Sequence, residues 1–262
     1  MGNVLELQGM SMSFGGLKAV DNLSFSVREN EILSIIGPNG SGKTTTFNVI
    51  SGLYEPDSGD ILLQGESVAG LRPDQVHERG ISRTFQSLRL FGNMTVLDNV
   101  LVGMHTRTKA GVVAAMLRLP SVRREEAAAK AKAQEVLAMF PGRFSGPRQS
   151  DPAFSLSYAN RRRLEIARAL ASEPALLLLD EPVAGMNPME SREVMEQIKE
   201  LRSRGYTILM IEHDMKVVEG VSDRVIAMDH GVKIAEGSYQ EVATNHLVVE
   251  AYLGKRGAGT AS

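Results

Sequence analysis

The sequence predicts an α/β protein in which a parallel sheet carries a phosphate-binding loop, and three observations predict it. The segment Gly37–Thr45 reads GPNGSGKTT and fits the pattern G-x-x-x-x-G-K-[ST], between the apolar run Ile32–Ile36 and a segment with helical character. Two more apolar runs, Ala175–Leu179 and Tyr206–Ile211, end in polar residues, as parallel strands do at a ligand-binding edge. Helical patterns dominate residues 94–163, which indicates a helical block inserted between strands.

The composition limits the classes of protein that remain. The chain has 262 residues, 43% of them hydrophobic, which is enough for one large α/β domain or a domain with a subdomain. A formal charge of -2 gives no support for a broad nucleic-acid-binding surface, so no nucleic-acid partner is expected. The absence of cysteine excludes disulfides, thiolate metal sites and a cysteine nucleophile. No signal-peptide pattern and no membrane-spanning apolar run is visible, so we expect a soluble or peripheral protein.

The first elements along the chain read as a half-exposed sheet. Apolar and polar residues alternate over Val4–Met12 and again over Leu23–Val27. Phe14 lies in the turn between these two strands, just ahead of the glycine-rich loop. An aromatic ring at that place could stack on an adenine ring, and a core phenylalanine is an equally open interpretation.

The chemistry of phosphate binding explains the spacing of the loop. Backbone N–H groups must approach phosphate oxygens closely, which favours residues without side chains at Gly37, Gly40 and Gly42. The positive end of the following helix points at the same oxygens. Lys43 adds a charge toward the β- and γ-phosphates, and the Thr44 hydroxyl can bind Mg²⁺. The expected nucleotide contacts are therefore Gly37, Pro38, Asn39, Gly40, Ser41, Gly42, Lys43, Thr44 and Thr45.

Short elements follow the loop. We expect a turn at Glu55–Gly59, a strand over Asp60–Leu63, one helical turn at Asp74–Glu78 and a strand over Ile81–Phe85. Gln86 comes at the end of that last strand. A single glutamine there is ordinarily a loop residue, and only the neighbouring motifs give it a functional interpretation.

Helices are expected in the middle of the chain. Thr95 can cap a helix over Val96–Met104, and Ser121 precedes a second helix that Pro141-Gly142 ends. One face of that second helix is apolar and consists of Ala129, Ala133, Val136, Leu137 and Phe140.

A third helix is expected over Arg161–Ala171, with Ser157 as a candidate N-cap. The consecutive arginines 161–163 could form an anion-binding patch, but a solvated helix face is the interpretation we favour.

Two strand ends carry candidate catalytic groups. Asp180 and Glu181 follow the run Ala175–Leu179, and carboxylates at such an edge are costly unless they meet a cation or a substrate. Asp180 would hold Mg²⁺ through water, and Glu181 would polarise the attacking water. His213 ends the next strand of the same sheet and could reach the γ-phosphate.

The rest of the chain reads as a helix over Ser191–Arg202, a hairpin of Val225–Met228 and Val232–Ala235, and a helix near Glu250–Leu253. A glycine-rich tail follows it.

The motifs, taken in this order and spacing, resemble those of the ATP-binding cassette (ABC) ATPases over nearly the whole chain. They are Phe14, GPNGSGKTT, Gln86, LSYAN at 156–160, LLLLDEP at 176–182 and His213. The resemblance implies a P-loop NTPase with a RecA-like parallel-sheet core, an antiparallel β subdomain and an inserted helical subdomain. It implies one ABC ATPase domain over residues 1–254, and a flexible tail at 255–262. The core and β subdomain would occupy 1–93 and 164–254, and the helical subdomain 94–163.

The resemblance also assigns roles. It implies that Phe14 stacks on adenine and that Gln86 senses Mg²⁺ and the transport partner. It implies that Glu181 is the general base and that His213 orients the γ-phosphate, with ATP and Mg²⁺ as cofactors.

Several stretches are similar to one subgroup, the ATP-binding subunits of branched-chain amino acid importers (LivG-type). They are RTFQ at 83–86, LFGNMTV at 90–96, EPVAGMNP at 181–188, IEHDM at 211–215 and AYLG at 251–254, together with the extended helical insert 111–140. The implied protein is the energy-coupling ATPase of an importer at the cytoplasmic face of the cell (inner) membrane. It would dock on two transmembrane permease subunits beside a second ABC ATPase subunit, in a homo- or heterodimer, and act indirectly with a solute-binding protein.

The signature segment Leu156–Asn160 would complete the ATP site of that second subunit, with Ser157 and Ala159 as its contacts. Tyr158-Ala159-Asn160 departs from the Gly-Gly-Gln of the wider family. We therefore expect the Ala159 Cβ to face the neighbouring γ-phosphate and weaken that site, so that Ala159→Gly should raise the ATPase rate.

Other functions are weighed against this one. The cassettes of urea and lipopolysaccharide transporters are similar, and they remain the alternative within transport. Soluble ABC ATPases that act on DNA or the ribosome carry long coiled coils or two cassettes, for which this chain has no room. A small-molecule kinase would need neither the signature segment nor the Asp180-Glu181 pair.

Overall fold

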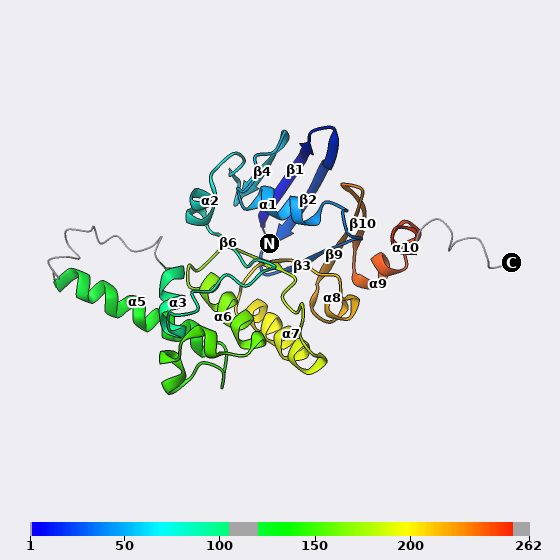
Figure 1. The fold of residues 1–262 in the computed structure, drawn as a ribbon. Helices are drawn as coiled ribbons and strands as arrows, with labels where there is room; N and C mark the ends of the chain where they lie inside the picture. The colour runs from blue at the N-terminus through cyan, green and yellow to red at the C-terminus, as the bar shows by residue number, and fades with distance from the viewer. Residues whose placement is uncertain (1, 105–119, 254–262) are drawn as a thin grey trace.

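Two sheets and a set of helices make up the structure, a computed structural model that describes residues 2–104 and 120–253 (Figure 1). One sheet has four strands in the order β2-β1-β4-β5, and the other has six in the order β10-β9-β3-β8-β7-β6. The four-stranded sheet lies on one side of the six-stranded sheet, and α3, α5, α6 and α7 lie on the other. This confirms the α/β class.

The four-stranded sheet is antiparallel throughout. Its strands are β1 (Asn3–Phe14), β2 (Leu17–Arg28), β4 (Ser58–Leu63) and β5 (Glu66–Ser67). The alternation expected over Val4–Met12 and Leu23–Val27 is confirmed, although both strands run several residues further. They meet at a tight turn, so that Phe14 pairs with Leu17.

The six-stranded sheet is parallel except for its last strand. The parallel strands are β3 (Ile32–Ile36), β6 (Ile81–Arg83), β7 (Leu176–Asp180), β8 (Ile208–Ile211) and β9 (Arg224–Asp229). β10 (Val232–Gly237) forms the expected hairpin with β9. The strand predicted to reach Phe85 ends at Arg83, because the carbonyl of Phe85 accepts a hydrogen bond from the side chain of Arg162 instead.

Burial on both faces explains why the leucine run of β7 is a strand. Leu176 and Leu178 face the core shared with the antiparallel sheet, whereas Leu177 and Leu179 face the helices. Each fully buried leucine contributes about 1.5–3 kcal/mol of transfer free energy. A central parallel strand therefore carries apolar residues at every position, and its polar residues fall at the ends.

The helices agree with the predicted ones to within a few residues, and three of them begin with capping side chains. The helices that match predicted ones are α1 (Lys43–Ile50), α2 (Pro73–Arg79), α3 (Val96–Gly103), α5 (Pro120–Ala138), α6 (Tyr158–Leu170), α7 (Pro188–Ser203) and α10 (His246–Leu253). The predicted caps are confirmed, since Thr95 accepts the Asp98 N–H and Ser157 accepts the Asn160 N–H. Helix α6 begins three residues before Arg161, the predicted start.

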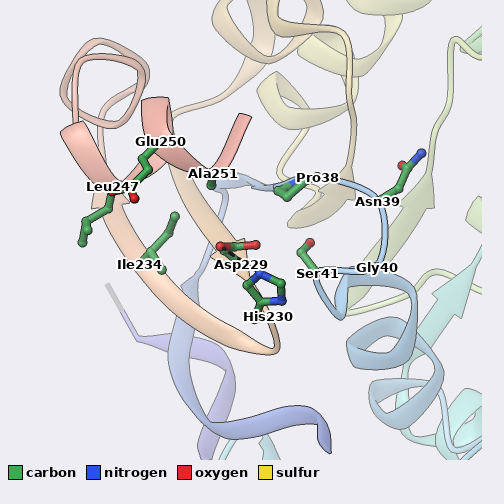
Figure 2. A pocket seen from close by; sticks show the side chains of 10 residues that line it. All are labelled: Pro38, Asn39, Gly40, Ser41, Asp229, His230, Ile234, Leu247, Glu250 and Ala251. Atoms are coloured by element: carbon green, nitrogen blue, oxygen red, sulfur yellow. Dashed lines mark ion pairs between the residues drawn. The ribbon is translucent and has the colours of Figure 1, made fainter. Parts of the chain in front are cut away.

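Two short helices were not predicted. These are α8 (Met215–Val221) and α9 (Tyr239–Ala243), which are too short to show helical periodicity. Each has a capping side chain that the sequence does display, Asp214 for α8 and Ser238 for α9. Helix α10 follows and lies beside the turn between β9 and β10 (Figure 2).

The predicted division into subdomains remains a prediction. Its boundary at 163/164 falls inside α6, whose Leu164 shares one hydrophobic cluster with Val100 of α3 and Val136 of α5. The predicted tail 255–262 and the first part of the predicted insert 111–140, residues 111–119, lie outside the described residues. Within the ranges that are described, no helix is both long enough and apolar enough to cross a bilayer.

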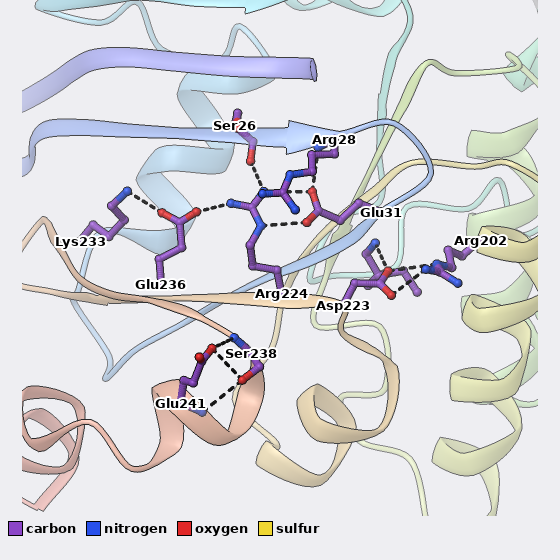
Figure 3. Close-up of polar contacts among 11 residues, drawn as sticks. Ser26, Arg28, Glu31, Arg202, Asp223, Arg224, Lys233, Glu236, Ser238 and Glu241 are labelled. Atoms are coloured by element: carbon purple, nitrogen blue, oxygen red, sulfur yellow. Dashed lines mark hydrogen bonds and ion pairs between the residues drawn. The ribbon is translucent and has the colours of Figure 1, made fainter. Parts of the chain in front are cut away.

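Ion pairs hold together the amino ends of β3 and β9 (Figure 3). The Arg224 guanidinium bonds both carboxylate oxygens of Glu31, at 2.8 and 3.0 Å, and also contacts Glu236. Asp223 accepts the Ile32 N–H at 2.9 Å and pairs with Arg202. The charged groups at this edge are therefore already paired with one another.

We expect Arg224→Met to lower the free energy of unfolding by about 3 kcal/mol, because it leaves the buried carboxylate of Glu31 without its cation. Urea denaturation monitored by circular dichroism measures this. Arg204→Met is the control, since Arg204 and Glu200 form an exposed pair. Equal midpoints for the two variants would contradict the assignment.

Candidate functional site

A cleft of about 670 Å³ lies at the carboxyl edge of the six-stranded sheet. This volume is in the range of small-molecule sites. Its lining brings together residues that lie far apart in the sequence: Phe14, Leu17, Lys18, Ala19, Asn39, Gly40, Ser41, Gly42, Lys43, Thr44, Thr45, Gln86, Glu181, His213 and His230. The glycine-rich loop, the glutamine, the glutamate and the histidine singled out in the sequence thus share one cleft.

The loop after β3 is folded around the side chain of Lys43. The Lys43 ammonium donates to the carbonyls of Gly37 at 2.8 Å and Pro38 at 2.9 Å, and contacts the Ser41 hydroxyl at 3.3 Å. Burial lowers the pKa of Lys43 below its ordinary value, although the nearby carboxylates of Glu181 and Asp180 oppose the shift. The Lys43 ammonium is therefore hydrogen-bonded to backbone carbonyls of the loop, and Lys43 lines the cleft.

The glycines of the loop are needed for more than one reason. A Cβ at Gly37 would lie 2.2 Å from the carbonyl oxygen of Met228 on β9, and one at Gly42 would lie 2.5 Å from that of Ala19. Both residues also have positive φ. At these two positions the crowding comes from neighbouring backbone, whereas a Cβ at Gly40 would meet no described atom within 4 Å. The expectation that the three glycines serve the approach of phosphate stays a prediction, and the structure adds a packing reason for glycine at Gly37 and Gly42.

Asp180, the last residue of β7, is paired with Arg83. Its Oδ2 lies 2.9 Å from the Arg83 guanidinium, and only 4% of Asp180 is exposed. Arg83 also donates to Asn48 at 2.7 Å and to Ser51 at 3.0 Å, both at the carboxyl end of α1. Arg83 belongs to the stretch RTFQ, but nothing in the pattern of β6 reveals its partner 97 residues away.

Glu181 lies between Gln86 and His213. Its Oε2 accepts from the Gln86 amide at 3.2 Å, and its Oε1 lies 3.5 Å from the His213 Nδ1. The Glu181 backbone has a φ of 47°, a conformation that non-glycine residues rarely adopt and that is concentrated at functional sites. The strained turn places the carboxylate in the cleft, with about a fifth of the side chain exposed.

Glu212 shapes the turn that presents His213. It is fully buried and accepts the N–H groups of His213 at 2.9 Å and Asp214 at 3.2 Å. Burial raises the pKa of its carboxyl above the ordinary value. The buried glutamate therefore fixes the backbone next to the histidine, whose own side chain is exposed to the cleft.

The available oxygen atoms fit a magnesium ion that is held mainly by phosphates and water. No group of three His, Cys, Asp or Glu residues in the described ranges could hold a metal by itself. The Thr44 hydroxyl and the Gln86 amide line the cleft, and Asp180 lies behind them. Mg²⁺ characteristically uses one or two such protein ligands and keeps several waters. Thr44, Gln86 and Asp180 stay predicted ligands.

Phe14 is not a core residue, which removes one of the two interpretations left open for it. It is 45% exposed at the mouth of the cleft, and its ring contacts Tyr54 edge-on with centroids 5.3 Å apart. A flat aromatic surface is thus available to a planar ring, and stacking there stays a prediction.

A second hollow lies on the other side of the same loop (Figure 2). It shares Asn39, Gly40 and Ser41 with the cleft, and Leu247 and Ala251 of α10 form its far wall. The C-terminal helix therefore flanks the loop, a contact that no pattern in the sequence indicates.

The signature segment lies away from the cleft. None of residues 156–160 belongs to the described lining, and Ser157 is exposed at the amino end of α6. Ala159 is only 2% exposed, so its methyl group points into its own subunit. The expectation that its Cβ faces a neighbouring phosphate is wrong, and with it the reason to expect a faster Ala159→Gly variant. A backbone contact from Ala159 stays a prediction.

The expectation of a solvated arginine face on α6 is wrong for two of its three members. Arg162 and Arg163 are 0% and 1% exposed. Arg162 pairs with Glu165 and donates to the carbonyls of Phe85 and Gln86, while Arg163 pairs with Glu193 of α7. The i, i+3 spacing of Arg162 and Glu165 was visible in the sequence, but their burial depends on elements packed from elsewhere in the chain.

Comparison with known proteins agrees with this geometry. A family model described as "ABC transporter" matches residues 20–184, and one described as "Branched-chain amino acid ATP-binding cassette transporter" matches residues 232–258. The high-affinity branched-chain amino acid transport ATP-binding protein LivG of Salmonella typhimurium is 45% identical over 96% of this chain and 98% of its own. The corresponding protein BraF of Pseudomonas aeruginosa is 41% identical over 96% and 98%. The lipopolysaccharide export ATP-binding protein LptB of Haemophilus influenzae is 34% identical over 97% and 98%.

Solved structures give the same picture. A nucleotide-free ATP-binding cassette from an ABC transporter superposes with a TM-score of 0.83, at 31% identity, over 97% of this chain and 100% of that one. A dimeric cassette in a post-hydrolysis state bound to ADP and phosphate superposes with a TM-score of 0.72, at 25% identity, over 90% and 98%.

The buried Lys43 predicts how nucleotide affinity depends on pH. Because its pKa is lowered, the ammonium loses its proton at a lower pH than an exposed lysine would, and its attraction for phosphate is lost with it. Titration with a fluorescent ADP analogue should show constant affinity below that pKa and a fall of up to about tenfold per pH unit above it.

Lys43→Met is the control for this titration. It should bind more weakly at every pH and show no such fall before pH 10.5, the ordinary lysine value. The same fall in Lys43→Met would assign the titration to another group.

Proposed function

The chain belongs to the ATP-binding cassette family of ABC transporters, and from this premise we propose that it hydrolyses ATP to power the import of branched-chain amino acids. The observation that carries the proposal is the group Gln86, Glu181 and His213, which faces the phosphate-binding loop within one cleft. Members of the family are ATPases, and the site has the groups that this reaction needs.

In the proposed reaction a water oxygen attacks the γ-phosphorus of ATP, and the bond from that phosphorus to the β,γ-bridging oxygen breaks. Glu181 receives the proton of the water, and ADP and phosphate are the products. The Gln86 amide, 3.2 Å from Glu181, fixes the carboxylate and its water, and His213 orients the γ-phosphate. Lys43 and the N–H groups of Gly37–Thr45 hold the phosphates, so that catalysis is mostly positioning and charge stabilisation.

A magnesium ion is part of the proposed reaction. When bound, Mg²⁺ neutralises charge on the β- and γ-phosphates. Thr44 and Gln86 would contact it directly, and Asp180 through water. Arg83 fixes the Asp180 carboxylate in place by their 2.9 Å contact.

A second cassette is part of the proposal. Ser157 lies at the exposed amino end of α6 and outside the cleft of its own chain, where a helix terminus offers N–H donors to an anion. Contact with the ATP of a second subunit would use those donors. Binding of ATP would then close a pair of cassettes, and hydrolysis would release it. A dimeric relative bound to ADP and phosphate supports this cycle.

Similarity supports branched-chain amino acids as the solute. LivG and BraF are 45% and 41% identical in sequence to this chain, whereas LptB is 34% identical. In addition, residues 232–258 match the family model of branched-chain amino acid cassettes. We propose two membrane permeases as partners and a peripheral place at the cytoplasmic face of the inner membrane. A solute-binding protein would act on the other side, without touching this chain.

We expect Glu181→Gln to lower ATP hydrolysis by about a hundredfold or more while ATP still binds, because the amide keeps the shape of the side chain but cannot accept the proton. Hydrolysis is measured as phosphate release by the transporter purified with its membrane subunits. ATP binding is measured with labelled ATP at equilibrium. Hydrolysis near the parent rate would refute Glu181 as the base.

The same variant tests the solute in the native host. Uptake of labelled leucine, isoleucine and valine should be lost, while uptake of labelled urea should continue. Loss of urea uptake alone would replace the solute and keep the mechanism. Glu196→Gln is a matched control, since Glu196 lies on the exposed face of α7 and forms only a surface pair.

A further inference from the structure

The segment that carries Gln86 is held by one face of α6. The Arg162 guanidinium donates to the carbonyl of Phe85 at 2.5 Å and to that of Gln86 at 2.7 Å. The Glu165 carboxylate accepts the N–H of Phe85 at 3.5 Å and that of Arg89 at 3.4 Å. Arg162 and Glu165 also pair with each other at 2.9 Å.

Both members of this pair are almost completely buried, with 0% and 1% of their surface exposed. Removing two charges from water is costly, and a hydrophobic pair of the same size often gives equal or greater stability. Global stability is therefore a weak explanation for the pair. The four backbone contacts suggest a different one, because they determine where the backbone of Gln86 lies.

The same helix carries the signature segment at its amino end. Ser157 is the N-cap of α6, five positions before Arg162. The segment continues to be held from the helical side, since Asn99 of α3 bonds both the N–H and the carbonyl of Phe91. The side chain of Gln86, in contrast, reaches Glu181 at the end of β7. The backbone of Gln86 is thus hydrogen-bonded to a helix, α6, whereas its side-chain amide is hydrogen-bonded to Glu181 at the end of a strand of the sheet.

We propose that the buried Arg162–Glu165 pair is a positioning device that ties Gln86 to α6, so that Gln86 meets Glu181 only when α6 is correctly placed. A shift of α6 relative to the sheet would carry Ser157 and Gln86 together. The completion of one ATP site by Ser157 would therefore be coupled to the position of the glutamine in the other. This inference rests on the proposed ATPase function.

Arg163 provides a matched control. It follows Arg162 on the same helix, is equally buried and pairs with Glu193 at 2.7 Å. Its other partners are Asn160 and Gln197, so within the described residues its hydrogen bonds tie α6 to α7 and do not reach the Gln86 segment. Arg163→Met should disturb packing as much as Arg162→Met does, without acting through Gln86.

The kinetic test uses the transporter purified with its membrane subunits. Arg162→Met should lower kcat by about tenfold to a hundredfold, because small misplacements of catalytic groups have effects of that size. The Kd for ATP should stay within about twofold, since Arg162 does not line the cleft. In a Gln86→Ala background, Arg162→Met should have no further effect on kcat, whereas Arg163→Met should have the same effect in both backgrounds.

A spectroscopic test does not depend on hydrolysis. The chain has no cysteine, so Ser87→Cys gives one site for a nitroxide label next to Gln86. The label should become more mobile with Arg162→Met and keep its mobility with Arg163→Met. If Arg162→Met does not fold, Glu165→Gln, which keeps the size of the side chain, should cause the same changes to a smaller extent.

The two hypotheses fail in different ways. If the parent transporter has no ATPase activity but Arg162→Met still makes the label at position 87 more mobile, the proposed function is refuted and the positioning of the Gln86 segment by Arg162 stands. An active parent in which Arg162→Met changes neither kcat nor the label would overturn the positioning role. Additive losses in the Gln86→Ala background would also overturn it, because Arg162 would then not act through Gln86.

Discussion

Strands buried on both faces are the constraint on which the rest of this structure depends. β3, β7 and β8 have buried side chains at every position, so their charged groups appear where each strand begins or ends. The polar side chain inside β3, Ser34, is hydrogen-bonded to Ser222. At the amino edge those groups are neutralised, as in the pair of Arg224 and Glu31. At the carboxyl edge Lys43 faces the cleft beside Glu181, and a ligand with several negative charges and a metal would complete the balance.

Buried charges that link distant segments of the chain have a different consequence. Arg83 and Arg162 each connect segments that are far apart in the chain, Arg83 by joining α1 to Asp180, and Arg162 by joining α6 to Gln86. Hydrogen bonds to charged groups are directional and strong when water is excluded. Such contacts do little for net stability, and in the proposed function they position Asp180 and the backbone of Gln86.

The placement of the signature segment and that of the cleft together explain why a single cassette is an incomplete enzyme in the proposed function. Ser157 is presented outward from α6, while Glu181 and the loop face a cleft that Ser157 does not line. Two copies or two related chains would be needed to bring the groups together. Association of the two cassettes would then drive transport, because a shift of α6 would move both Ser157 and Gln86.

The sequence by itself determined the elements and the cleft. These features depend on local geometry, which the spacing of residues along the chain reveals. They are the loop GPNGSGKTT, the apolar runs that end at Asp180 and His213, and the caps Thr95 and Ser157. The short helices α8 and α9 were missed because two turns are too few to show a period.

Only the tertiary structure decided which side chains are buried and what they touch. Arg162 and Arg163 look like a solvated face in sequence, yet the packing of residues 85–91 and α7 against α6 encloses them. Ala159 looked like a group facing a partner and is instead packed inward. The physical reason is the same in each case, because burial depends on elements brought together from distant parts of the chain, and no local pattern encodes that approach.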